Sequence, residues 1–177
     1  KLILSKDNHI KRSLLDTFLG SLSFKLTKSQ NNVLEDFKLD LSSQNPMSRL
    51  LQGDVGSGKT IIAIASILYI VERGYQGAFM APTEVLAEQH YKNLLNNLNP
   101  LVINIELLTG NTPQKKRREI FKNLVNGQID LLIGTHALFE EKVIFNSLGI
   151  VVIDEQHRFG VSQRNRLIKK GENAHLL

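Results

Sequence analysis

The chain has 177 residues, 42% of them hydrophobic, which is enough for one domain with a full apolar core. Because it contains no cysteine, disulfides, thiolate zinc sites and cysteine nucleophiles are excluded, and a reducing, cytoplasmic location is expected. The apolar run at residues 61–71 is shorter than the ~18 to 20 residues of a membrane span, so we expect no membrane anchor and no leader. The net charge of +5 is weak support for an anionic partner.

Taken in chain order, the apolar spacing predicts two amphipathic helices and then an alternation of strands and helices. The two helices are expected over residues 8–19 and 28–39, with a loop at 42–46. Strands are then expected near residues 48–52, 77–81, 102–108, 130–134 and 149–153, and helices near 59–72, 84–97, 113–126 and 161–170. This alternation predicts an α/β fold with a parallel, doubly wound sheet and helices on both of its faces.

A glycine-rich loop lies between the first expected strand and the helix that follows it. The letters GDVGSGKT fit the pattern G-x-x-x-x-G-K-[ST] of a phosphate-binding loop, the P-loop. Glycines let the backbone turn so that its N–H groups surround a triphosphate, while Lys59 reaches the β and γ phosphates and the Thr60 hydroxyl ligates Mg²⁺. We therefore expect nucleotide contacts from Gly53, Asp54, Val55, Gly56, Ser57, Gly58, Lys59 and Thr60.

A pair of carboxylates follows the last expected strand. Asp154 and Glu155 come directly after the apolar run 150–153, so they should stand at the carboxyl edge of the sheet, where parallel sheets bind ligands. There Asp154 can hold Mg²⁺, and Glu155 can deprotonate the attacking water. A carboxylate that caps a nearby backbone group is the alternative. Together with the P-loop, the pair predicts a nucleoside triphosphatase whose catalytic residues are Lys59, Asp154 and Glu155.

Around these residues the sequence resembles the RecG family of superfamily 2 DNA helicases. The letters DEQHRFGV at residues 154–161 are similar to the second helicase motif of that family, and residues 53–60 are similar to its first. Ser23 departs from the pattern, because a proline often stands there. The resemblance spans residues 22–177 and extends to the relatives PriA and the transcription-repair coupling factor. Further similar positions are Phe24, Lys25, Leu26, Thr27, Gln30, Gln163 and Arg164 and the segments 81–90, 108–110 and 134–138.

The resemblance implies a RecA-like P-loop NTPase domain, the first motor lobe of an ATP-dependent DNA helicase. Such enzymes use ATP and Mg²⁺ for branch migration or unwinding of branched DNA, such as stalled forks and Holliday junctions, in recombination and repair. It implies residues 23–177 as the ATP-binding lobe and residues 1–22 as a helical linker from an upstream wedge region. The wedge and a second lobe with an arginine finger are expected outside this chain, which alone should be nearly inactive. The implied enzyme is a monomer that binds branched DNA.

The resemblance also assigns roles to two residues beside the ATP motifs. Gln30 would contact the adenine, whereas a glutamine on a helix surface is the alternative. His157 would couple the ATP site to the DNA track or the second lobe, and a structural hydrogen-bond donor is the alternative. A metal-ligand role for His157 is disfavoured, because no histidine or cysteine partner has ligand spacing.

Polar residues after the expected strands are candidates for DNA contact. Hydroxyls and backbone amides at strand ends can bind phosphates without reading bases, although helix capping suits Thr83 and Thr135 equally well. The basic run at residues 115–118 can be a solvated helix face or a DNA contact. With the family resemblance, the residues expected to contact DNA are Thr83, Thr109, Gly110, Thr135 and His136.

Other classes of function fit less well. A GTP switch would need D-x-x-G and N-K-x-D segments, and neither occurs in the sequence. A small-molecule kinase would not need the D-E-x-H of residues 154–157 and would want an arginine-bearing lid, for which we find no candidate. A PriA-like or transcription-repair-coupling translocase and a nucleotide-binding module without turnover stay as alternatives. Phosphate contacts alone do not separate DNA from RNA, so only the resemblance selects DNA.

Overall fold

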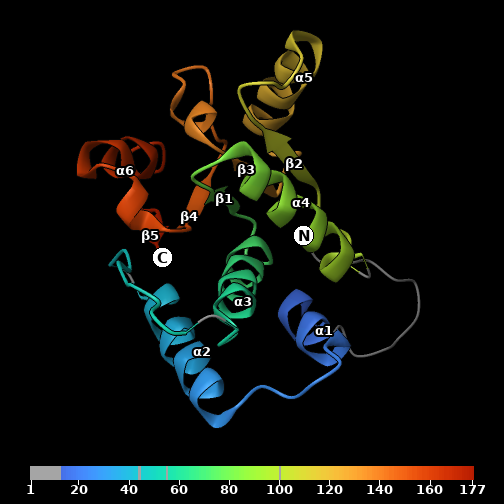
Figure 1. The fold of residues 1–177 in the computed structure, drawn as a ribbon, viewed down its shortest axis with the longest axis vertical. Coiled ribbons are helices and arrows are strands. Elements are labelled where there is room, and N and C mark those ends of the chain that lie inside the picture. The colour runs from blue at the N-terminus through green and yellow to red at the C-terminus, as the bar shows by residue number, and fades with distance from the viewer. Residues whose placement is uncertain (1–12, 44, 55, 100) are drawn as a thin grey trace.

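The computed structural model describes residues 13–43, 45–54, 56–99 and 101–177 (Figure 1). The helices are α1 (Leu14–Ser21), α2 (Lys28–Leu41), α3 (Lys59–Val71), α4 (Glu84–Leu98), α5 (Gln114–Val125) and α6 (Val161–Ile168). The strands are β1 (Gln76–Met80), β2 (Ile105–Leu108), β3 (Leu131–Gly134), β4 (Leu148–Ile153) and β5 (His175–Leu176). Two short 3₁₀ helices are η1 (His136–Phe139) and η2 (Gln156–Arg158).

The strands of the described residues form one parallel sheet in the order β2-β3-β1-β4-β5. In the centre of this sheet, Phe79 on β1 pairs with Ile133 on β3 and with Val152 on β4. Because the strands run in one direction, the loops that follow β1, β2, β3 and β4 meet at the same edge. These loops carry most of the polar residues singled out in the sequence, and the predicted α/β fold is confirmed.

The sheet separates two apolar cores. Helices α1, α2, α3 and α4 pack on one face, with strand residues such as Phe79 and Val152 (Figure 1). Helices α5, η1 and α6 pack on the other face, with Met80 and Val151. Neighbouring residues of β1 and β4 therefore face opposite cores, which explains why every residue of these two strands is buried. The helices cover both faces of the sheet, as the alternating pattern predicts.

Helix α3 is buried along most of its length and holds the end of the P-loop. Its residues 62–71 are all buried, and α1 and α2 pack against it. The hydroxyl of Ser66 is satisfied inside this core by donating to the Ile62 carbonyl at 2.9 Å. The helix is followed by Gly74, whose φ of 87° is in the left-handed region that favours glycine. The P-loop thus ends in a helix that is fixed on all sides by apolar contacts.

The segment before the P-loop differs from the prediction. Residues 48–52 do not form a strand; instead Ser48 makes an isolated parallel bridge to Leu176. Leu50 is 64% exposed, so the apolar residues that suggested a buried strand are not enclosed on both sides. On the side of β4 away from β1, the neighbouring strand is β5, which the sequence did not predict. It has two residues and is bonded to the segment at Met47, whose carbonyl accepts from the Leu176 N–H at 2.7 Å.

The remaining elements agree with the prediction apart from their bounds. The strand expected over residues 102–108 begins at Ile105, and the helix expected over 161–170 ends at Ile168. The first predicted helix, 8–19, begins before the described residues, and within them α1 starts after Ser13, whose Oγ accepts from the Asp16 N–H at 2.9 Å. None of the helices in the described ranges combines the length and the apolar character that crossing a membrane requires.

Candidate functional site

A cavity of about 420 Å³ lies at the carboxyl edge of the sheet, between the P-loop and the end of β4. The P-loop lines it with Gly53, Lys59 and Thr60, and residues 154–157 line it from the other side. The two motifs that stand 94 residues apart in sequence thus share one cavity. We name it the ATP cavity, after the ligand that the sequence predicts.

The backbone of the P-loop turns through two glycines in the left-handed region. Gly56 has a φ of 79° and Gly58 a φ of 84°, conformations that a residue with a Cβ rarely adopts. The Lys59 ammonium donates to the carbonyl oxygens of Gly53 at 2.6 Å and Asp54 at 2.7 Å. Val55 lies outside the described residues. Because α3 begins at Lys59, the positive end of its dipole also faces the ATP cavity.

Gln30 lies against the P-loop from the start of α2. Its Oε1 accepts from the Thr27 N–H at 2.8 Å, and the Gln30 N–H donates to Thr27 Oγ1 at 3.2 Å, which forms a capping box. Its Nε2 donates to the Ser57 carbonyl at 2.9 Å, and a Cβ on Gly58 would collide with the Gln30 side chain. One polar end of the Gln30 side chain therefore caps α2, and the other joins α2 to the P-loop. Its contact with adenine stays a prediction.

Asp154 follows β4 and is held by a residue to which the sequence assigned no role. Its Oδ2 lies 2.8 Å from Nε2 of His90, whose side chain is 16% exposed and packs on the Phe79 ring at a centroid distance of 4.7 Å. The pKa of Asp154 is lowered, first by the hydrogen bond from His90 and further by the charges of His90 and Lys59, against the effect of burial. Asp154 is therefore ionised and oriented. His90 belongs to the segment 81–90 that resembles the helicase family, but no local pattern links it to a carboxylate 64 residues away.

Glu155 stands at the turn between β4 and η2 with a φ of 48°, in the left-handed region. The Arg158 N–H donates to the Glu155 carbonyl at 2.8 Å, and Arg158 Nε lies 3.6 Å from Glu155 Oε2. Glu155 and His157 are both exposed and both line the ATP cavity. A side chain that reaches solvent inside this cavity can take up a proton from water, which is what the predicted role of Glu155 needs.

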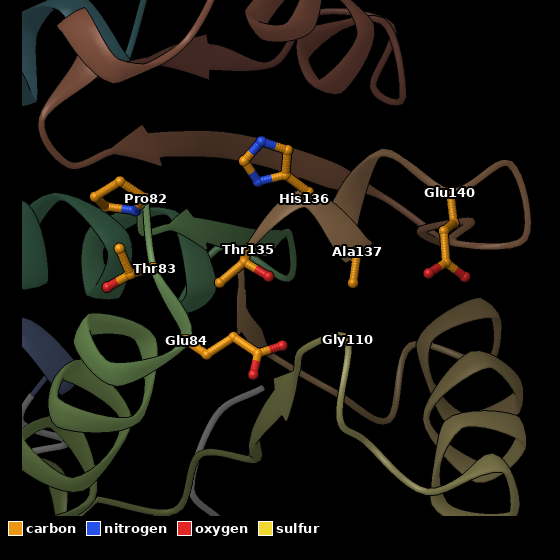
Figure 2. Close-up of a pocket in the computed structure, with 8 residues that line it drawn as sticks. All are labelled: Pro82, Thr83, Glu84, Gly110, Thr135, His136, Ala137 and Glu140. Atoms are coloured by element: carbon orange, nitrogen blue, oxygen red, sulfur yellow. The ribbon is translucent and has the colours of Figure 1, made fainter.

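A second cavity, of about 450 Å³, opens further along the same edge (Figure 2). It is lined by the loops that follow β1, β2 and β3 and by the start of α4. We name it the edge pocket. The residues that line it are Pro82, Thr83, Glu84, Gly110, Thr135, His136, Ala137 and Glu140.

Four of the five residues expected to contact DNA line the edge pocket, and the fifth, Thr109, is buried beside Gly110. Thr83 caps α4 by accepting from the Leu86 N–H at 3.2 Å, so the capping interpretation is confirmed there. Thr135 is buried and makes no side-chain cap to η1. His136 is exposed. The centroid of its ring lies 5.9 Å from that of Phe139 and 5.8 Å from that of Phe159. DNA contact by these residues stays a prediction.

The basic run at residues 115–118 is not a uniform solvated face. Lys116 pairs with Glu106 at 2.8 Å, while the Arg117 side chain is 11% exposed and bonds to the loop after β2. Lys115 and Arg118 are exposed. Helical periodicity could not separate these roles, because the partners of Lys116 and Arg117 lie on other elements.

Comparison with known proteins agrees with the motifs. The matching family model is that of the DEAD/DEAH box helicases, over residues 25–174. The ATP-dependent DNA helicase RecG of Synechocystis sp. is 54% identical over 164 residues, which are 93% of this chain and 20% of that protein. The ATP-dependent DNA helicase RecG of Borreliella burgdorferi is 46% identical over 177 residues, 100% of this chain and 26% of that protein. The chain thus spans about a fifth to a quarter of the length of these relatives.

Solved structures give the same result. A structure of RecG bound to a three-way DNA junction matches with a TM-score of 0.84 and 46% identity, over 93% of this chain and 22% of that chain. The helicase Lhr of Mycobacterium smegmatis, bound to ssDNA and AMP-PNP, matches with a TM-score of 0.67 over 93% of this chain and 24% of that chain, and its 21% identity supports the fold alone. The RecA-like fold and the resemblance to RecG are both confirmed. The chain belongs to the DEAD/DEAH box helicase family.

Proposed function

We propose that this chain is the ATP-binding motor lobe of a RecG-type helicase that couples ATP hydrolysis to the remodelling of branched DNA in recombination and repair. The observation that carries the proposal is the ATP cavity, in which Lys59, Asp154 and Glu155 meet. The identity of 54% to a RecG helicase supports the RecG type over PriA-like and transcription-repair-coupling translocases. The RecG structure contains a three-way junction, which supports branched DNA as the substrate.

In the proposed reaction, Lys59 leaves the carbonyls of the P-loop and binds the β and γ phosphates of ATP. The N–H groups of the loop and of the first turn of α3 bind the same phosphates. Glu155 orients the attacking water and accepts its proton as the water oxygen bonds to the γ phosphorus. The bond from this phosphorus to the β–γ bridging oxygen breaks, and ADP and phosphate are the products. Gln30 contacts the adenine, and His157 passes the state of the ATP cavity to the DNA track or to a second lobe.

The residues of the ATP cavity fit Mg²⁺, which Thr60 and Asp154 would hold. Across the described residues, no three His, Cys, Asp or Glu side chains lie close enough together to hold a metal ion by themselves. A sparse set of oxygen ligands suits Mg²⁺, which keeps several waters and is bound by one or two carboxylates together with substrate phosphates. When bound, Mg²⁺ would neutralise charge that develops on the phosphates.

The edge pocket is the proposed DNA surface. It combines the N-terminus of α4, which favours anions, with hydroxyl and amide groups that bind phosphates without reading bases. The proposed enzyme is a monomer. Its upstream wedge region and its second lobe act on the same DNA as this lobe, and residues 1–22 link the wedge to this lobe. The second lobe supplies an arginine to the γ phosphate, a contribution of about 10³ to 10⁵ in rate. The enzyme would work in the cytoplasm, where bacterial chromosomes lie.

The nucleotide site is tested by Lys59→Ala in the full-length protein. We expect Mg·ATP affinity, measured by calorimetry, to fall at least about tenfold, because a charge-assisted contact to two phosphates is lost. Lys92→Ala is the matched control, since Lys92 is exposed on α4 and does not line the ATP cavity. Equal binding by the two variants would show that the P-loop is not the nucleotide site.

A further inference from the structure

Two carboxylates line the edge pocket, Glu84 at the start of α4 and Glu140 after η1 (Figure 2). A free carboxylate in this place would repel a nucleic-acid phosphate, since the two carry charge of the same sign. Both carboxylates are instead bound to donors of the protein. The contacts that they make join three segments of the chain, each of which follows a different strand.

Glu84 holds the loop that follows β2. Its Oε1 accepts from the Asn111 N–H at 3.3 Å, and its Oε2 accepts from the Asn111 side-chain amide. Figure 2 shows the Glu84 side chain reaching from α4 toward Gly110. A Cβ on Gly110 would lie 2.9 Å from Glu84 Oε1, so a larger residue at this position would require the carboxylate to shift. Glu84 thus fixes residues 109–111 against the N-terminus of α4.

Arg117 holds the same loop from its other side. Its Nη2 donates to the carbonyl oxygens of Thr109 at 2.7 Å and Gly110 at 3.4 Å, while its Nη1 donates to Glu140. The guanidinium is a planar fork with fixed donor directions, which lets one mostly buried side chain bridge two segments. Arg117 thus fixes residues 109–111 relative to the segment that carries Thr135 and His136.

We propose that Glu84 and Arg117 are positioning residues for nucleic-acid binding: they set the spacing of the three phosphate-contacting segments of the edge pocket without touching the nucleic acid. The proposal rests on the proposed function of this pocket as a DNA surface. Bound in this way, Glu84 contributes to phosphate binding although its own charge opposes it. Rigid spacing matters because phosphates along a strand are regularly spaced, and a loop free to move must lose conformational entropy on binding.

The sign of the effect separates positioning from simple electrostatics. Removing a carboxylate from a phosphate-binding surface should strengthen binding if only charge matters. If Glu84 positions the loop, its removal weakens binding instead. For Arg117 the informative change is Arg117→Lys, which keeps the positive charge but loses the planar fork. Electrostatics predicts little change for that variant, and positioning predicts weaker binding.

The test is a fluorescence-anisotropy titration of a labelled synthetic three-way DNA junction with the full-length protein. We expect Glu84→Ala and Arg117→Lys each to weaken binding by roughly fivefold to tenfold. The matched controls are Glu88→Ala, on the exposed side of α4, and Arg118→Lys, exposed beside Arg117; both should stay within about twofold of wild type. Tighter binding by Glu84→Ala, or Arg117→Lys equal to Arg118→Lys, would overturn the proposal.

Hydrogen exchange in the free protein reports the positioning directly. The Asn111 amide, which donates to Glu84, should exchange faster in Glu84→Ala than in Glu88→Ala. Unchanged exchange there would also overturn the proposal. Thr135→Val and His136→Ala distinguish a failure of the proposed function from a failure of the positioning proposal. If these variants bind the junction as wild type does while the exchange effect is present, the edge pocket is not the DNA surface, although the loop is positioned as inferred.

Discussion

The ATP cavity and the edge pocket differ in what holds their polar groups in place. In the P-loop, Lys59 is held by carbonyls of Gly53 and Asp54, six and five residues earlier in the chain. In the edge pocket, Glu84 bonds to a residue 27 positions away, and Arg117 bonds to Glu140, 23 positions away. The first arrangement is contained in a short motif. The second exists only after the sheet has brought separate loops together.

This difference explains why one cavity can be recognised in sequence more completely than the other. The P-loop carries both Lys59 and the carbonyl groups that hold it. In the edge pocket, the sequence indicates the groups that can meet a phosphate, such as Thr83 and Thr135, but not the side chains that set their spacing. Two residues are exceptions at the ATP cavity, because His90 supports Asp154 from 64 residues away and Gln30 bonds to the P-loop from 27 residues away.

The largest effect is expected where the local motif carries the chemistry. Glu155→Gln in the full-length protein should keep ATP binding and lose about 10²- to 10⁴-fold in turnover, because the side chain keeps its shape but can no longer accept a proton from water. Phosphate release at saturating Mg·ATP measures this. A variant with half the wild-type turnover would exclude Glu155 as the base and would weaken the view of residues 154–157 as a self-contained motif.

Substitutions at His90 test one of these exceptions. Loss of its hydrogen bond should leave Asp154 less well oriented toward Mg²⁺, and such support is typically worth 10- to 100-fold in metal affinity. His90→Phe keeps a ring on Phe79 but loses the N–H, whereas His90→Gln keeps an N–H and loses the ring. We expect His90→Phe to need a Mg²⁺ concentration about tenfold higher than wild type for nucleotide binding. For His90→Gln we expect a much smaller increase.

Nucleotide binding titrated with Mg²⁺ in the full-length protein provides the measurement, and thermal unfolding of each variant controls for packing. The opposite order, with His90→Gln more impaired than His90→Phe, would show that His90 acts through its packing on Phe79. The hydrogen bond between His90 and Asp154 would then not be what orients Asp154 toward Mg²⁺.

The smallest effect is expected at His175, outside both cavities. Burial lowers the pKa of His175, which is 8% exposed, and its Nδ1 accepts from the Met47 N–H at 2.9 Å. The unfolded chain therefore takes up a proton near pH 6.5 that the folded chain resists, so the stability from neutral His175 is complete above that pH and falls as the pH drops below it. The loss is at most about 1.4 kcal/mol per pH unit.

Urea unfolding of wild type and His175→Asn at pH 7.5 and 5.5 measures this contribution. The asparagine oxygen can still accept from Met47 but does not titrate, so the variant should lose less stability on acidification than wild type. Identical pH dependence in the two proteins would show that His175 does not contribute. Other titrating groups are common to both proteins and cancel in the comparison.

The parts of the fold that the sequence predicts are those whose causes are local. Buried apolar runs indicated β1, β3 and β4, and the P-loop glycines indicated the start of α3. The expected strand at 48–52 was wrong, because its apolar residues are partly exposed and its pairing depends on Leu176. In the same way β5 exists through contacts with β4 and with the segment at Met47. Pairing between distant segments leaves no periodic trace in either of them.

At position 155 the left-handed backbone favours glycine for stability, whereas the proposed hydrolysis needs a carboxylate. A residue with a Cβ in that region is destabilised by about 1 to 2 kcal/mol, while glycine adopts it freely. A library of variants at this position that is screened only for thermal stability should therefore yield residues other than carboxylates. The same library screened for hydrolysis should yield a carboxylate. At position 155 the two kinds of selection should therefore favour different residues, glycine for stability and a carboxylate for hydrolysis.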